Sequence, residues 1–389
     1  MTEATDETVV LLRSLVQCPS PSGQEEAVQR LIADWLRLNG VATTLQTTAD
    51  GLSNVFATVR GDRHGEAAPS LLLLGHADTV LPGNGWTHDP YSGVLEGHRL
   101  YGRGAVDMKA GLAAAMLAMR ELARRSDWCG TVSFASVADE EASSRGAVDL
   151  IARGLRFDAA VVCEPHFDDP VVGGVGKINV RITCRGRSAH GSRPEEGVNA
   201  IDAMARLLHA LQASPVREHP LVGRGSRCVL RIQSGDGPYE IRVPDRCSCL
   251  VNWHLVPGES ADDVVGELRA LAESVSPAVD AIFDVLPPAY PSYLTAPDHP
   301  FLRHFTETYR REFGHDPAFA YGRGVSDANL LADSGIPTVM FGPSGANLHA
   351  ADEWVDVRQI GEAARFYVAL ATSERTWTSG QSGHRKDHS

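Results

Sequence analysis

The sequence predicts an α/β domain with a mostly parallel, helix-covered sheet, interrupted by an inserted ferredoxin-like α+β domain. Strand-like and helical segments alternate up to about Glu164, which is typical of a parallel sheet covered by helices on both faces. From about Gly176 the expected order becomes β-α-β-β-α-β, the order of a ferredoxin-like unit. After a Pro-rich segment at 286–293 the first pattern resumes, so we expect the chain to return to the domain that it left.

This order divides the chain into four expected segments. A chain of 389 residues is longer than one hydrophobic core usually supports. We assign residues 1–177 and 289–373 to the two parts of the α/β domain, and residues 178–288 to the inserted domain. The polar tail 374–389, with His384 and His388, is expected to be disordered and to take no part in chemistry.

Each expected element rests on a local pattern. Helical periodicity and a capping glycine predict helices, and short apolar runs predict strands. In the α/β domain we expect helices at 4–17, 24–39, 109–125, 300–313, 328–334 and 357–372, and strands at 41–47, 54–60, 71–74, 131–137, 159–163 and 338–342. In the inserted domain we expect strands at 177–185, 227–233, 246–256 and 279–286, and helices at 197–212 and 260–275.

Composition excludes several classes of partner. The net charge of -13 argues against a nucleic-acid backbone, which needs clustered Lys and Arg. No apolar run approaches the roughly 20 residues of a membrane span, and the acidic N-terminus is unlike a signal peptide. Seven scattered cysteines fit a reducing, cytoplasmic location. Cys247 and Cys249 should face one side of a strand and serve packing, since no second pair is near to complete a metal site.

Polar residues gather at points where an open α/β sheet presents its ligand-binding edge. His76 and Asp78 follow the apolar run LLLL at 71–74, which is typical of a buried parallel strand. The other candidates follow strand ends or the Gly-rich turn YGRGAVD; they are Asp107, Glu140, Glu141, Glu164 and His349. We therefore expect these side chains to meet at one edge of the sheet.

Two histidines with several carboxylates suit a borderline divalent metal, and the absence of cysteine favours a catalytic over a structural site. There are enough carboxylates for two ions, which together can activate water and polarise an amide carbonyl. Because Glu140 and Glu141 are neighbours, we expect one to bind metal and the other to move a proton.

The chain resembles the M20 metallopeptidase family, which includes acetylornithine deacetylase, succinyl-diaminopimelate desuccinylase, aminoacylase and glutamate carboxypeptidase. The resemblance spans nearly the whole chain through HADTVLP, YGRGAVDMKAGLAAAM, the acidic triplet at 139–141, SAHGSRPEEGVNAI, and GIPTVMFGP followed by HAADEWV. It implies that His76 and Glu164 bind one zinc and that Glu141 and His349 bind the other. It also implies that Asp107 bridges the two ions and precedes a cis peptide bond.

The resemblance assigns further roles. Glu140 would be the general base, and the carboxylate of Asp78 would orient His76. His190, in the inserted domain, would reach the partner subunit's active site and donate a hydrogen bond to the oxyanion. The inserted domain would thus be both lid and dimer interface.

Some positions depart from the common family pattern, and they concern the substrate. Ile241 stands where an Asn is usual, and a strand motif that usually reads Asp-Arg-Arg is Asn252, Trp253 and His254. An arginine that could bind a substrate carboxylate is therefore missing from that strand. Arg323 is a candidate replacement, so Arg323 and Asn252 are the expected substrate-binding residues.

The sequence predicts a cytoplasmic, homodimeric, two-zinc amidohydrolase that removes an acetyl- or succinyl-like group from the amine of an amino acid or a similar small molecule. Co²⁺ or Mn²⁺ could replace zinc. A metallo-dipeptidase or carboxypeptidase with the same metal site is the alternative. A non-catalytic binding protein of the same fold is a remote one, because Glu140 and all five ligand positions are intact.

Overall fold

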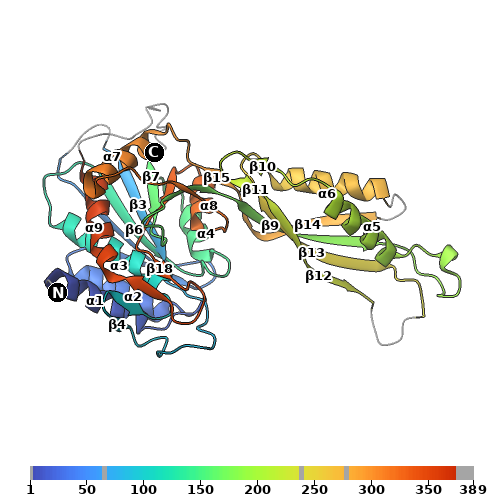
Figure 1. Ribbon diagram of the computed structural model, residues 1–389, viewed down its shortest axis with the longest axis horizontal. Coiled ribbons are helices and arrows are strands. Elements are labelled where there is room, and N and C mark those ends of the chain that lie inside the picture. Colours follow the sequence, from blue (N-terminus) through green and yellow to red (C-terminus); the bar gives the residue numbers. More distant parts are fainter. Residues whose placement is uncertain (1–2, 64–67, 236–240, 276–279, 374–389) are drawn as a thin grey trace. The chain divides into compact units, whose positions relative to one another are not determined.

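A computed structural model describes residues 3–63, 68–235, 241–275 and 280–373 (Figure 1). The chain divides into two compact units, and Tyr321–Val325 belongs with the second, although the division made from sequence placed it in the α/β domain. The predicted disordered tail at 374–389 lies outside the described residues. The first unit falls within 1–172, 295–320 and 326–389, and the second within 173–294 and 321–325.

The first unit is built on a mixed sheet with a parallel centre. Its strands, in order across the sheet, are β1 (Thr43–Thr47), β2 (Ser53–Arg60), β6 (Thr131–Val137), β3 (Ser70–His76), β7 (Ala159–Val162), β17 (Thr338–Met340) and β8 (Val171–Gly174). The strands from β6 to β17 pair in parallel, and the β1–β2, β2–β6 and β17–β8 pairs are antiparallel. Leu71 and Leu74 of β3 are at most 1% exposed, as expected for a central strand covered on both faces. The predicted α/β fold is confirmed.

The helices of this unit position the turn that precedes α3. They are α1 (Glu3–Val16), α2 (Glu26–Leu38), α3 (Ala110–Ala123), α4 (Arg145–Ala152), α7 (Pro300–Phe313), α8 (Asp327–Asp333) and α9 (Val357–Thr372). A Cβ atom at Gly111 would lie 1.9 Å from the carbonyl oxygen of Cys163, so only glycine lets α3 approach the end of β7 this closely. This contact brings the one-turn segment η1 (Ala105–Lys109) towards the residues that follow β7.

A small antiparallel sheet, which the sequence did not predict, joins two distant segments of the first unit. Its strands are β18 (Gly345–Ala346), β19 (Trp354–Asp356), β5 (Arg99–Tyr101) and β4 (Val94–Glu96). Trp354 pairs with Tyr101 and stacks under the guanidinium of Arg99, whose Cζ atom lies 4.2 Å from the ring centroid. The turn after β5 therefore lies beside the loop before β19.

The second unit contains the predicted β-α-β-β-α-β order. Its antiparallel sheet runs β12 (Ser226–Ser234), β13 (Arg246–Leu255), β9 (Gly176–Arg185) and β14 (Asp280–Tyr290), with α5 (Ala200–Ala213) and α6 (Ala261–Val275). Alternate residues of β9 and β13, such as Val180 and Val251, form one hydrophobic core with both helices. The shorter elements of this part of the chain are η2 (Pro194–Glu196), β10 (Glu218–His219), β11 (Gly223–Arg224), β15 (Tyr293–Leu294) and β16 (Ala320–Gly322).

One element of the second unit differs from expectation. The linker was predicted to begin at Leu286, but β14 continues to Tyr290. The Pro287–Pro288 peptide bond is cis, and the register of β14 against β9 shifts between Leu286 and Tyr290. Proline is tolerated here because β14 is the last strand of the sheet and these positions need no ladder hydrogen bond.

Two features concern the chain as a whole. All seven cysteines are free, and Cys247 and Cys249 are buried in the core of the second unit, in agreement with the predicted packing role. None of the helices in the described part of the chain combines the length and the apolar character that are needed to cross a bilayer.

Candidate metal centre

His76 is the last residue of β3, and a main-chain contact at Nδ1 holds its ring. Its Nδ1 atom lies 2.9 Å from the main-chain carbonyl oxygen of Asp78. A proton on Nδ1 can donate to that carbonyl, which leaves Nε2 with a lone pair for a metal ion. The Asp78 carboxylate was expected to orient this ring, but its Oδ1 atom is farther from Nδ1, at 3.5 Å. The main chain of Asp78 therefore makes the shorter contact.

The Asp78 carboxylate instead holds the loop that carries the two adjacent glutamates. It accepts hydrogen bonds from the backbone N–H groups of Glu140 at 2.9 Å and Glu141 at 3.1 Å, and from the Ser22 hydroxyl at 2.7 Å. Burial opposes ionisation of Asp78, but the hydrogen bond and charge of His76 and the bond from Ser22 hold the Asp78 pKa below its usual value. Asp78 is thus an ionised anchor between the end of β3 and the loop after β6.

Asp107 lies between the two histidines. Its Oδ1 atom is 3.1 Å from Nε2 of His76, and its Oδ2 atom is 3.1 Å from Nε2 of His349. The Asp107–Met108 peptide bond is cis, as the family resemblance implied. Although burial opposes ionisation, the hydrogen bonds from His349 and His76 hold the Asp107 pKa well below its usual value. The two carboxylate oxygens therefore serve different neighbours.

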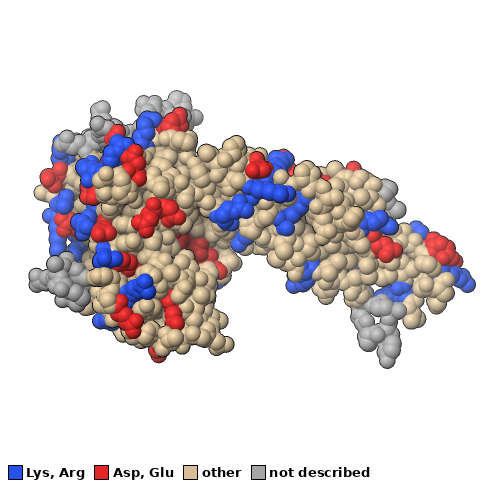
Figure 2. Space-filling view, in the orientation of Figure 1, with Lys and Arg blue, Asp and Glu red and all other residues tan. Residues whose placement is uncertain are grey.

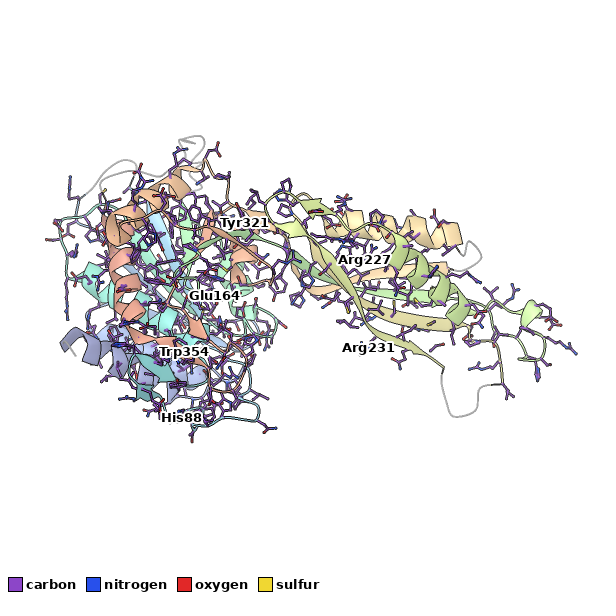
Figure 3. All side chains as sticks on the ribbon, in the orientation of Figure 1. His88, Glu164, Arg227, Arg231, Tyr321 and Trp354 are labelled. Carbon is purple, nitrogen blue, oxygen red and sulfur yellow. The ribbon has the colours of Figure 1, made fainter. Side chains whose placement is uncertain are left out.

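Two glutamates complete the cluster. Glu141 Oε1 lies 3.0 Å from Nε2 of His349, and Glu164 Oε1 lies 3.8 Å from Nε2 of His76. Glu164 follows β7 in the first unit (Figure 3). The structure thus brings together all five residues that the sequence indicated as metal ligands.

The electrostatics of this cluster favour a cation. Burial, followed by the negative charge of Asp107, raises the Glu164 pKa to about 8, and burial and Asp107 also raise the pKa of Glu141. A hydrogen bond with Asp107 and the charge of Glu141 outweigh burial and raise the His349 pKa to about 9. These carboxylates repel one another unless protons or metal ions separate them. Ligand atoms of His76, Asp107 and Glu141 lie within 4.8 Å of one another, a donor set of imidazole nitrogen and carboxylate oxygen that fits a divalent ion.

Glu140 lies beside the cluster. Burial, together with the charges of Asp327, Glu164 and Glu141, raises the Glu140 pKa well above its usual value, although His76 opposes this. A raised pKa makes the Glu140 carboxylate a better proton acceptor, and the protonated carboxyl group can return that proton. This property fits the base that the sequence predicted at this position.

The remaining predicted site residues belong to the second unit. The His190 ring is exposed, and its Nδ1 atom lies 2.7 Å from the Ser192 hydroxyl. Asn252 donates from Nδ2 to Oδ1 of Asn179 at 3.0 Å. Arg323 donates from Nη1 to the carbonyl oxygen of Arg224 at 2.7 Å, in the segment that begins at Tyr321 (Figure 3). None of these residues is part of the metal cluster itself.

Two residues that the sequence did not single out support the cluster. Arg103 and Glu353 form a buried ion pair beside Asp107. Both lie within motifs that carried the family resemblance, YGRGAVD and HAADEWV, but charged residues are mostly exposed, so a sequence gives no sign that such a pair is buried.

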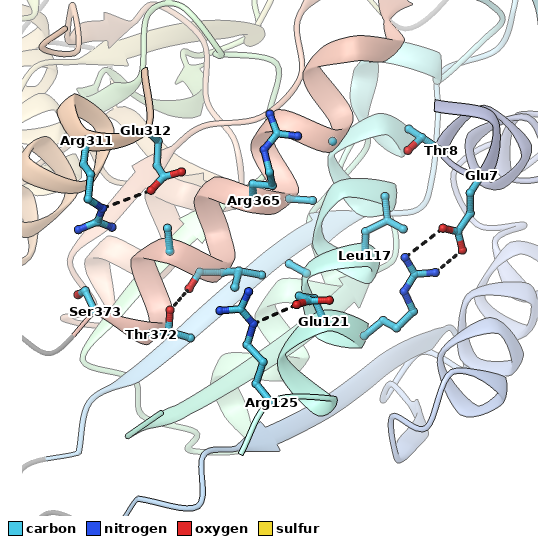
Figure 4. Close-up of a pocket in the computed structure, with 16 residues that line it drawn as sticks. Glu7, Thr8, Leu117, Glu121, Arg125, Arg311, Glu312, Arg365, Thr372 and Ser373 are labelled. Carbon is cyan, nitrogen blue, oxygen red and sulfur yellow. Dashed lines mark hydrogen bonds and ion pairs between the residues drawn. The ribbon is translucent and has the colours of Figure 1, made fainter. Parts of the chain in front are cut away.

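A hollow between α1, α3, α7 and α9 is a separate feature of the first unit (Figure 4). Charged side chains at its surface already pair with one another, as Glu121 does with Arg125 and Arg311 with Glu312. None of the candidate metal ligands lines it. The chemistry is therefore assigned to the cluster around Asp107.

Known proteins resemble this chain along most of its length. It is 31% identical over 379 residues to a succinyl-diaminopimelate desuccinylase of Methylorubrum extorquens, covering 92% of this chain and 96% of the relative. A desuccinylase of Paracoccus denitrificans is 31% identical over 372 residues, covering 92% and 95%.

Solved structures share the fold. Aminopeptidase PepT from Bacillus cereus superposes with a TM-score of 0.77 at 22% identity, covering 94% of this chain and 98% of that one. A dinuclear metal-binding peptidase of the M20 family from Bacillus subtilis superposes with a TM-score of 0.74 at 20% identity, covering 94% and 97%. Residues 72–373 match the family model described as peptidase family M20/M25/M40. The chain therefore belongs to the M20/M25/M40 family of metal-dependent hydrolases.

Proposed function

We propose that this chain is a two-zinc amidohydrolase that removes an acetyl- or succinyl-like group from the amine of an amino acid or a similar small molecule. The observation that carries the proposal is the position of Asp107, whose two oxygens each lie 3.1 Å from a different histidine nitrogen. A carboxylate in this position can bridge two ions. Co²⁺ or Mn²⁺ would suit the same donors.

The contacts support a division of the ligands. His76 and Glu164 would hold one ion, since their ligand atoms are 3.8 Å apart, and Glu141 and His349 would hold the other, at 3.0 Å. Asp107 would be shared. When bound, the ions would activate water and polarise the amide carbonyl.

Glu140 would move the proton. Its backbone N–H is tied to the Asp78 carboxylate, so its place beside the cluster is fixed. It would accept a proton from the attacking water and deliver it to the departing nitrogen. The exposed His190 ring, with Nδ1 held by Ser192, would offer Nε2 as a hydrogen-bond donor to the oxyanion in a partner subunit.

The substrate would carry a free carboxylate. Arg323, His254 and Lys177 form a basic group in the second unit: His254 of β13 pairs with Lys177 of β9, and Arg323 donates to the carbonyl oxygen of Arg224. Burial and the positive charges of Lys177 and Arg323 lower the His254 pKa, which places three basic side chains near one another. Basic side chains also gather over β10 and β11 (Figure 2). A guanidinium such as that of Arg323 binds carboxylates in two-point fashion.

Asn252 would assist on the same face. The odd-numbered residues of β13 from Cys247 to Leu255 lie in the helix-covered core, so Asn252 and His254 face the opposite side of the sheet. The hydrogen bond from Asn252 to Asn179 holds its amide in place beside this basic group.

A homodimer through the second unit completes the proposal. β12 is the outermost strand of its sheet, and its exposed apolar residues include Leu230 at 57% and Ile232 at 55%. Such an edge readily pairs with another chain. The free thiols are consistent with a reducing, cytoplasmic compartment.

A substrate panel and one variant test the proposal. We expect hydrolysis of N-acetyl or N-succinyl amino acids and little hydrolysis of dipeptides; the reverse preference would favour the peptidase alternative. Glu140→Gln should lower kcat by roughly 10²–10⁴-fold while metal content stays at two ions per chain. Glu121→Gln, on the surface of α3, is the matched control. A wild-type enzyme that binds metal but hydrolyses no amide would favour a binding protein.

A further inference from the structure

Arg103 and Glu353 form an ion pair in the interior of the first unit. Arg103 is 1% exposed and Glu353 is 0% exposed, and Nη1 of Arg103 donates to Oε2 of Glu353. The pairing of Tyr101 with Trp354 brings their two segments together. A buried ion pair recovers little net stability after its desolvation cost, so its presence calls for another explanation.

Glu353 holds the turn that carries Asp107. Its carboxylate accepts backbone N–H groups from Gly104 at 3.1 Å, Val106 at 3.0 Å and Asp107 at 3.2 Å. Its carbonyl oxygen accepts the N–H of Gly102 at 2.9 Å. Glu353 thus accepts four backbone N–H groups between Gly102 and Asp107, including that of Asp107 itself.

Arg103 holds the other segment. Its Nη2 atom donates to the carbonyl oxygen of Ala350 at 3.1 Å, one residue beyond His349. The His349 side chain is 51% exposed, and its backbone φ of 59° lies in the left-handed region that residues other than glycine seldom adopt, so the neighbouring main chain must hold this conformation. The face of the guanidinium rests 5.4 Å from the centroid of the Trp86 ring, which limits its movement.

We infer that Arg103 and Glu353 act together as positioning residues that set the distance between Asp107 and His349, and thereby the affinity of the centre for divalent metal. Glu353 fixes Asp107, Arg103 fixes the main chain next to His349, and the ion pair joins the two. This inference rests on the proposed metal centre. It assigns the pair no contact with substrate.

Arg103→Lys is the most informative variant. It keeps the buried positive charge but replaces the planar guanidinium, which can donate in several fixed directions, with a single ammonium group. A lysine ammonium that binds the Glu353 carboxylate cannot at the same time donate to the Ala350 carbonyl oxygen as the guanidinium does. We expect the apparent Kd for Zn²⁺, measured by chelator competition on protein refilled after metal removal, to rise about tenfold or more. The unfolding midpoint of the metal-free protein should change little, because the charge pair is retained.

Two further measurements separate positioning from a general structural role. Excess Zn²⁺ should restore kcat of Arg103→Lys with KM unchanged. Glu353→Gln, which keeps an acceptor oxygen and the side-chain shape, should also weaken zinc binding even if Arg103→Lys fails to fold. Arg310→Lys, in an exposed ion pair with Asp316, is the control and should bind zinc as the wild type does.

Zinc affinity of the variants tests the positioning role, and metal binding by the wild type tests the metal centre itself. Wild-type zinc affinity in both Arg103→Lys and Glu353→Gln would overturn the inference and leave the metal centre standing. A loss of zinc affinity matched by an equal loss of stability in the metal-free protein would also overturn it. A wild-type protein that binds no divalent metal would overturn the proposed function first.

Discussion

Oδ2 of Asp107 lies 3.1 Å from Nε2 of His349. The turn before α3 is thus in contact with the loop between β18 and β19. The second oxygen of the same carboxylate faces His76. Neither histidine alone would define a centre for two ions. Asp107 is therefore the residue on which the proposed binding of two ions depends.

Asp107→Asn tests this dependence. An amide offers one neutral oxygen in place of two charged ones, so it cannot serve both histidines as a bridging ligand. We expect metal content to fall from two ions per chain to less than one after dialysis, measured by mass spectrometry of the metal. His349→Ala should retain one ion, because His76, Glu164 and Asp107 remain. Two ions in Asp107→Asn would contradict the bridging role.

The pH dependence of metal binding follows from two pKa shifts. In the metal-free protein the pKa of His349 is raised from 6.5 to about 9, and that of Glu164 from 4.5 to about 8. A metal ion needs both groups deprotonated, so binding should release protons and tighten as pH rises towards about 9. Calorimetry in buffers of different ionisation enthalpy measures this release. An affinity that stays flat from pH 6.5 to 9 would count against the assignment.

The raised pKa of His349 also makes the stability of the metal-free protein depend on pH. A group whose folded pKa is raised contributes stability that is complete below its unfolded pKa and is lost as pH rises through the folded value. For His349 the loss falls between pH 6.5 and about 9. The unfolding midpoint of the metal-free enzyme should therefore decline over this window, and His349→Ala should decline less. Identical slopes for the two proteins would contradict the shift.

The sequence predicted the large elements because each carries its own periodicity. The expected strand at 131–137 is β6 without change, and the expected helix at 300–313 is α7. The small sheet of β4, β5, β18 and β19 was missed because strands of two or three residues show no alternation. Arg103 and Glu353 were missed for a related reason: nothing in the sequence marks which charged residues are buried.

Arg323→Ala tests the recognition of a substrate carboxylate. Removing the guanidinium should raise KM for a carboxylate-bearing substrate by roughly tenfold or more, because charge-assisted hydrogen bonds contribute about 1.5–3 kcal/mol. The KM for the corresponding methyl ester or amide should change little, and kcat should be nearly constant. Arg303→Ala, on the surface of α7, is the control. Equal effects on the acid and the ester would exclude a carboxylate contact.

The exposed edge strand β12 is the proposed dimer contact. Lysine at an exposed edge strand blocks pairing with a second chain because its charge cannot be buried in the new interface. We expect Leu230→Lys combined with Ile232→Lys to convert a dimer into a monomer in analytical ultracentrifugation. Because His190 is proposed to act in the partner's site, kcat should fall in the monomer while zinc content is unchanged. Val10→Lys, at a comparably exposed apolar position on α1 with 62% exposure, should leave the dimer intact. A monomeric variant with full activity would exclude a role for His190 in the partner's site and would show that each chain hydrolyses substrate alone.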